Sequence, residues 1–260
     1  MAEKAKVRPI NIDRFMADPP FNRVIKMGVE LEGGWIKTPV GVALERDTSV
    51  FGGISQPGYK VGELPIGAVQ PVAIKKLLAK YYPDLTDSTC GMHVHMSFEN
   101  AFQYSVLEVP EYQETMVEYL HRWALEENLT STHPIWPRLA GKNEFCRKEF
   151  WPDMQVSTTR KDWDHNRKGH RYTMIHYCGR LATIECRILP MMENAEIAFR
   201  AVDRVRQVTN ACLMVLAPTQ RHIKERVKIE LPDEDRYEET IEIEIPLSGG
   251  QRKALNRGTR

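Results

Sequence analysis

Three short runs of the sequence place charged or metal-binding residues on either side of a single apolar one. They are Glu30-x-Glu32, His93-x-His95 and Glu185-x-Arg187. Because successive side chains of a β-strand point to opposite faces, each pair shares one face if its run is a strand. Carboxylates and imidazoles bind divalent metals, and guanidinium groups recognise phosphate and carboxylate oxygens. The pattern therefore predicts a polar sheet face that could hold a metal ion and an anion.

Each pair taken alone also has an ordinary structural interpretation. Glutamates that alternate along an edge strand are typical of a solvated face, and an HxH pair is as easily a surface pair or half of an unrelated metal site. The combination is more informative, because carboxylates gathered on neighbouring strands need cations to offset their repulsion. Carboxylates with one imidazole suit Mg²⁺ or Mn²⁺, which leave room for substrate phosphates.

Arginines gather in the sequence between the middle helix and the last of these runs. They are Arg160, Arg167, Arg171, Arg180 and Arg187. Their planar donors suit phosphate and carboxylate oxygens. Metal, phosphate and carboxylate together indicate ATP-driven activation of a carboxylate.

The elements that must position these residues are predicted from hydrophobic periodicity. Strands are expected at 24–32, 59–65, 89–98, 171–178 and 181–189, with a tight turn at Gly179-Arg180, and helices at 71–81, 110–128 and 194–217. Hairpin-connected strands flanked by helices indicate an α+β domain built on an antiparallel sheet.

Composition sets outer limits on function. There are 36 Lys and Arg residues against 35 Asp and Glu, so the net charge of +1 creates no overall field that would recruit nucleic acid or a membrane. The N-terminus lacks a signal-peptide pattern, and no run approaches the roughly 20 apolar residues of a membrane span. A cytoplasmic protein is expected. The five cysteines have no CxxC spacing and are expected to be buried or half-buried free thiols.

The chain divides into a body and two tails. Residues 1–22 are predicted to be an N-terminal extended arm, because Asp18-Pro19-Pro20 disfavours helix, and residues 23–218 to be one catalytic domain. Residues 219–260 are predicted to be a C-terminal hairpin, acidic and alternating, followed by a basic tail. The hairpin would dock on the body or form a homo-oligomer. The tail could touch phosphate or remain solvated.

These motifs resemble those of the amidoligases, in the carboxylate-amine ligase superfamily with glutamine synthetase and glutamate-cysteine ligase. The resemblance covers about residues 24–205. It rests on Gly28-Val29-Glu30-Leu31-Glu32, Asp47-Thr48-Ser49, Gly62-Glu63-Leu64-Pro65, Cys90-Gly91-Met92-His93-Val94-His95 and Thr183-Ile184-Glu185-Cys186-Arg187, which follow the family's order. It implies a glutamine synthetase catalytic-domain-like antiparallel sheet, with helices packed on one face and a polar active-site face.

The resemblance also implies a role for each residue. Glu30, His93 and Glu185 would hold one metal ion, Mg²⁺ or Mn²⁺, and Glu32 and Glu63 a second one near the carboxylate substrate. The expected catalytic residues are Arg180, Arg187 and Glu63, and the expected contacts to ATP are His95, Arg171, Arg180 and Arg187. Asp47 would supply a further metal or water ligand.

The implied reaction is phosphorylation of a carboxylate by ATP to an acyl phosphate, which an amine then attacks. The carboxylate and amine substrates could belong to a small molecule, a peptide or a modified base, and contact with nucleic acid stays open. Three departures bound the resemblance. Glutamine synthetase uses one more carboxylate between its first strand and its HxH strand, which only Asp47 could replace here. The segment before Val24 is too short for that enzyme's N-terminal domain, and His176 stands where the family often has Asn.

Two other classes of function remain as alternatives. A zinc-dependent hydrolase would use His93, His95 and one carboxylate to activate water. A non-catalytic assembly or binding protein would keep the fold and act through the acidic hairpin and the basic tail. Binding of metal and nucleotide separates the three.

Overall fold

The computed structural model describes residues 7–16, 24–37, 39–45, 58–149, 172–178 and 183–217. Several predicted features lie outside these residues: Asp47, Arg171, Arg180, the turn at 179–180, most of the arginine-rich segment, and the C-terminal hairpin and tail. In the ranges described, no helix combines the length and the apolar character needed to cross a membrane.

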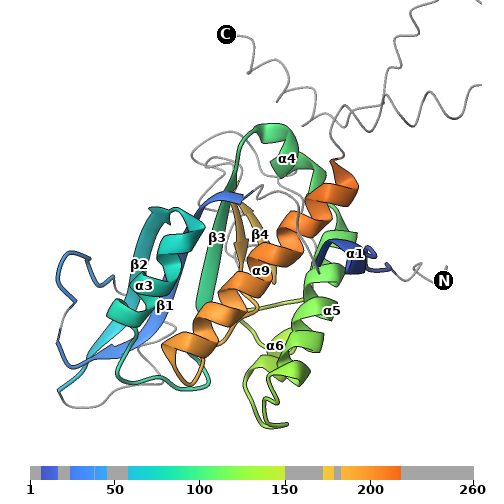
Figure 1. The fold of residues 1–260 in the computed structure, drawn as a ribbon. Helices are drawn as coiled ribbons and strands as arrows, with labels where there is room; N and C mark the ends of the chain where they lie inside the picture. The colour runs from blue at the N-terminus through green and yellow to red at the C-terminus, as the bar shows by residue number, and fades with distance from the viewer. Residues whose placement is uncertain are drawn as a thin grey trace, which may run out of the picture.

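Five antiparallel strands form one sheet in the order β2-β1-β3-β5-β4. The strands are β1 Val24–Trp35, β2 Lys60–Val69, β3 Met92–Phe98, β4 Ile175–Cys178 and β5 Thr183–Cys186 (Figure 1). The predicted α+β class and antiparallel sheet are confirmed. The sheet order brings β1, β3 and β5, which carry the three polar pairs, side by side.

Strand boundaries differ from the prediction where side chains or prolines intervene. β3 begins at Met92 rather than Thr89, because the Asp87 carboxylate accepts hydrogen bonds from the Thr89 amide at 2.8 Å and hydroxyl at 2.6 Å and holds a turn there. β2 continues past Pro65 to Val69, which an edge strand tolerates. β5 ends at Cys186, so Arg187 lies directly after the strand.

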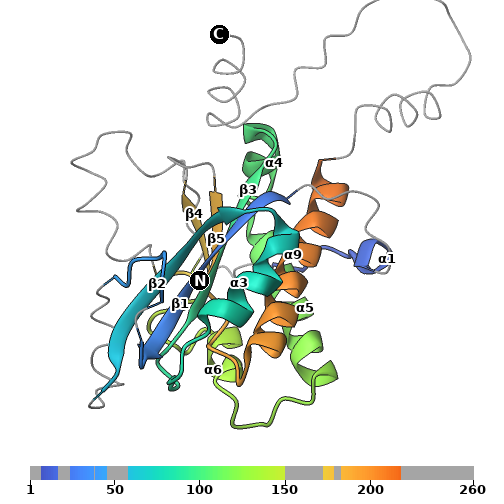
Figure 2. The same cartoon turned by 60° about the vertical axis from the view of Figure 1, so that its left-hand side comes forward.

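Three predicted helices are present and cover one face of the sheet (Figure 2). The first prediction corresponds to the 3₁₀ turn η1 Pro71–Ala73 followed by α3 Ile74–Tyr81, and the others to α5 Pro110–Glu126 and α9 Ala195–Leu216. Asn194 caps α9, since its side chain accepts from the Glu196 and Ile197 amides at 3.0 Å. Between this layer and the sheet lies the main apolar core, with Val29, Leu31, Met92, Val94, Met96 and Ile184 buried.

Short helices that periodicity did not predict complete the described body: α1 Asp13–Met16, α4 Ala101–Val106 and α6 Ile135–Leu139. The described part of the N-terminal arm is therefore not simply extended. Ile12 is fully buried, and the Ile10 amide donates to Thr115 Oγ1 on α5 at 2.7 Å. Four cysteines, Cys90, Cys146, Cys186 and Cys212, are buried free thiols as expected.

Candidate metal and anion site

The face of the sheet opposite the helices collects the polar pairs. Strand register places Glu30 beside His93, Glu32 beside Glu63, and His95 beside Glu185. Their apolar neighbours point into the core on the other face, as the alternation predicted. Two carboxylates that stand directly opposite, such as Glu32 and Glu63, repel each other unless a cation lies between them.

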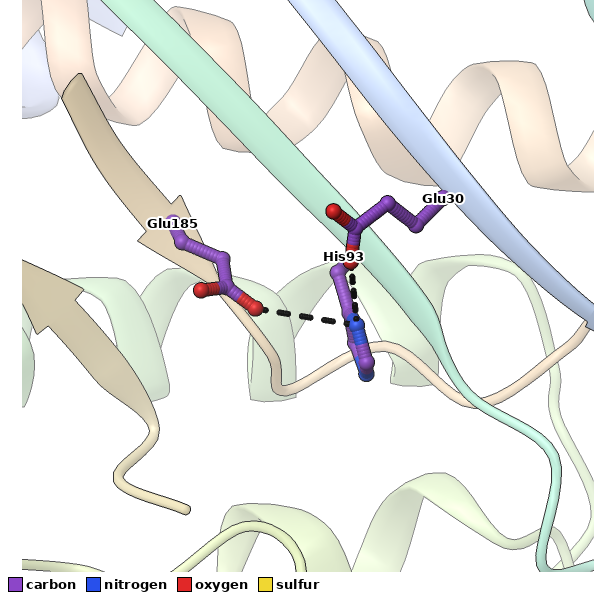
Figure 3. A group of neighbouring side chains, drawn as sticks. All are labelled: Glu30, His93 and Glu185. Atoms are coloured by element: carbon purple, nitrogen blue, oxygen red, sulfur yellow. Dashed lines mark hydrogen bonds and ion pairs between the residues drawn. The ribbon is translucent and has the colours of Figure 1, made fainter. Parts of the chain in front are cut away.

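The first ligand group consists of Glu30, His93 and Glu185, from three neighbouring strands. His93 Nδ1 lies 3.0 Å from Glu30 Oε2 and 3.6 Å from Glu185 Oε1, and Figure 3 shows both carboxylates directed at the ring. One ligand atom from each residue falls within 4.8 Å of the others. This spacing suits three protein ligands around one cation.

The second ligand group consists of Glu32, Glu63 and His93, with ligand atoms again within 4.8 Å of one another. Here the opposite ring nitrogen is involved, since His93 Nε2 lies 3.5 Å from Glu32 Oε1. A neutral imidazole has one free lone pair and can ligate one ion. If the first group takes that lone pair, Glu32 and Glu63 remain as the protein ligands of the second ion.

Four side chains of the polar face are buried almost as completely as those of the apolar face, whereas Glu30, Glu63 and His95 are partly exposed. Exposed fractions are 4% for Glu32, 2% for His93, 5% for Glu185 and 7% for Arg187. Arg187 donates through Nη1 to Glu185 and forms an ion pair with it. Burial raises the pKa of Glu185, but the charges of Arg187, His95 and His93 outweigh burial, so its net pKa is lowered and the carboxylate stays ionised.

His95 contacts Glu30 instead of standing free on the strand. Its Nε2 lies 2.9 Å from Glu30 Oε1, which is close enough for an ion pair when the imidazole is protonated. Burial lowers the pKa of His95, while Glu30 and Glu185 raise it, with a net rise. Burial raises the pKa of Glu30, but the contacts with His93 and His95 lower it by more, so the net pKa is lowered. The raised pKa of His95 thus favours a positive charge on its imidazole, which offsets part of the negative charge of the carboxylates.

Arg138 is a site residue that the sequence did not predict. It lies on α6, is 1% exposed, and has its guanidinium near Glu32, Arg187 and the start of β3. Its only signal in the sequence is a charged residue inside the apolar stretch Ile135-Trp136-Pro137-Arg138-Leu139, which periodicity alone did not distinguish. Both Arg138 Nε and Arg187 Nε are buried and have no hydrogen-bond partner among the described residues.

The structure thus brings together Glu30, Glu32, Glu63, His93, His95, Glu185 and Arg187, whereas Asp47, Arg171 and Arg180 fall outside the residues it describes. No protein-family model, curated protein or solved structure matches the chain. The fold and the site define an α+β protein with a buried cluster of carboxylates, imidazoles and arginines on one face of an antiparallel sheet.

Proposed function

We propose that this chain is an ATP- and divalent-metal-dependent carboxylate-amine ligase of the amidoligase type, with a catalytic domain like that of glutamine synthetase. One observation carries the proposal: the two ligand groups adjoin, share His93 and are otherwise made of glutamates. Carboxylate-rich groups suit Mg²⁺ or Mn²⁺. Two adjoining cations on such a face are suited to the phosphates of ATP and to an attacking carboxylate.

The buried arginines supply the second part of the chemistry. Transfer of a phosphoryl group builds charge on its equatorial oxygens, which bound cations and guanidinium donors stabilise. Arg187 Nε has no hydrogen-bond partner among the described residues, and its charge is already held at the cluster by Glu185. In this proposal Arg187 contacts phosphate or the acceptor, and His95 contacts nucleotide phosphate. Arg171 and Arg180 keep the roles that the resemblance implies.

The amide would form in two steps. A carboxylate oxygen of the substrate attacks the γ-phosphorus of ATP, which releases ADP and leaves an acyl phosphate. An amine then attacks the acyl carbon, phosphate leaves with the C–O bond electrons, and the amine gives up a proton. No covalent intermediate with the protein is needed, so this chain's residues bind, orient and neutralise charge.

The zinc-hydrolase alternative is less well supported by the geometry. That mechanism needs both histidines and one carboxylate around a single ion. In the described part of the chain, neither ligand group contains His95, whose Nε2 lies 2.9 Å from Glu30 Oε1.

A screen of paired carboxylates and amines tests the proposal, with ATP-dependent phosphate release and mass detection of the product as readouts. Glu185→Gln should abolish ATP turnover, because it removes a charged ligand from the first group. Glu126→Gln is the matched control, since that side chain is 60% exposed at the end of α5 and pairs with Arg204. Undiminished turnover in Glu185→Gln would contradict the assignment. Tight Zn²⁺ binding without nucleotide binding would favour the hydrolase, and binding of neither would favour the assembly protein.

A further inference from the structure

Arg138 joins two segments that carry the metal ligands. Its Nη1 donates to the carbonyl of Arg187 at 3.2 Å, and its Nη2 donates to the carbonyl of Thr89 at 3.3 Å. Arg187 follows β5, which carries Glu185, and Thr89 precedes β3, which carries His93. A planar guanidinium fixes the relative positions of two acceptors in a way that a single ammonium group does not.

Gly91 lies at the point where this link meets the second ligand group. A Cβ atom at this position would be 3.1 Å from Arg138 Nη1, 3.1 Å from Glu32 Oε2 and 3.1 Å from His93 Nε2. The Gly91 amide also donates a hydrogen bond to Glu32 Oε2. The orientation of Glu32 therefore depends on the position of the Gly91 backbone, two residues after the carbonyl that Arg138 holds.

We infer that Arg138 is a positioning residue for the second ligand group. It holds the segment 89–91 against the end of β5, so that the Gly91 amide orients Glu32 toward Glu63 and His93. The absence of a side chain at Gly91 lets these groups converge. This inference rests on the metal-binding part of the proposed function.

Charge and positioning make opposite predictions for Arg138. A positive charge close to Glu32 opposes the binding of a cation, so if Arg138 acted only through charge, its removal would tighten metal binding. If Arg138 positions Glu32, its removal weakens binding, as the loss of outer-shell partners commonly does by about 10–100-fold.

Mn²⁺ titration of the full chain, by calorimetry and by electron paramagnetic resonance, tests the inference. Wild type should bind two ions and give the signal of a neighbouring pair. Arg138→Met should lower the affinity for one of the two ions by at least about tenfold and remove the signal of the neighbouring pair. Arg138→Lys, which keeps the charge, should not restore it. Arg147→Met, an exposed arginine from the same region, is the control and should match wild type.

Gly91→Ala supplies a second variant in case Arg138→Met does not fold. The added methyl group should displace Glu32 or His93 and lower the affinity for the same ion. Unchanged or tighter Mn²⁺ binding in either folded variant overturns the inference and leaves the proposed function standing. If wild type binds no Mn²⁺, both fail. If wild type binds two Mn²⁺ ions and the variants bind one of them more weakly, but wild type turns over no ATP with any substrate pair, the positioning role stands and the ligase assignment fails.

Discussion

The two faces of the sheet are both largely buried, but different interactions stabilise the side chains on them. On the helix-covered face, Val94 and Met96 are fully buried among apolar side chains, where each buried methylene lowers the free energy of folding. On the opposite face, Glu185 and His93 are almost as inaccessible, yet each ionised group there needs a partner of opposite charge. A buried ion cluster contributes little net stability because desolvation offsets attraction. The comparison indicates that the apolar face supplies most of the stability, and the polar face is the one that we propose binds metal.

Met96→Ala is the largest test of this division. Met96 lies on β3 between Met27 and Ile184 and is fully buried, so its truncation leaves a cavity and should lower the free energy of unfolding by about 2–5 kcal/mol. Chemical denaturation measures this change. Mn²⁺ affinity of the folded variant should not move. Val72→Ala, at a side chain 84% exposed, is the control and should change stability by less than about 0.5 kcal/mol.

Glu30→Gln is the converse test on the polar face. The neutral amide removes a charged ligand from the first group, so Mn²⁺ affinity should fall by at least about tenfold. Stability should fall by less than in Met96→Ala, because the repulsion from Glu185 disappears together with the contacts to the imidazoles. Glu99→Gln, an exposed carboxylate beyond β3, is the control. A loss of stability as large as that of Met96→Ala would end the proposed separation of the two faces.

The smallest effect is expected for an ion pair at the surface. Arg200 donates to both Glu127 oxygens at 2.8 and 2.7 Å, and this hydrogen bonding, against the opposing effect of burial, lowers the pKa of Glu127. A lowered folded-state pKa means stabilisation that is present above the ordinary carboxyl pKa of about 4.3 and lost as the pH falls through the folded-state pKa. The effect should be below about 1 kcal/mol. As the pH is lowered from about 6 to about 2, the melting temperature should therefore fall slightly less steeply for Glu127→Gln than for wild type. An identical slope would mean that the ion pair contributes nothing to stability.

Much of the layout follows from local patterns in the sequence. Alternation along β1, β3 and β5 predicted which residues face the core, and apolar spacing predicted α3, α5 and α9. The short helices were missed, because a helix such as α6 Ile135–Leu139 is too short to show a period and is held by tertiary contacts. The turn that makes β3 begin only at Met92 depends on the side chain of Asp87, which hydrophobic periodicity does not detect.

The sequence by itself determined which residue types could bind metal and which face of its strand each would occupy, because both depend on chemistry and a two-residue period. Only the tertiary structure decided that Glu63 stands opposite Glu32, that His93 lies between two groups of carboxylates, and that Arg138 reaches them from a separate helix. Those relations depend on strand register and helix docking between residues far apart in the chain, which local pattern does not encode.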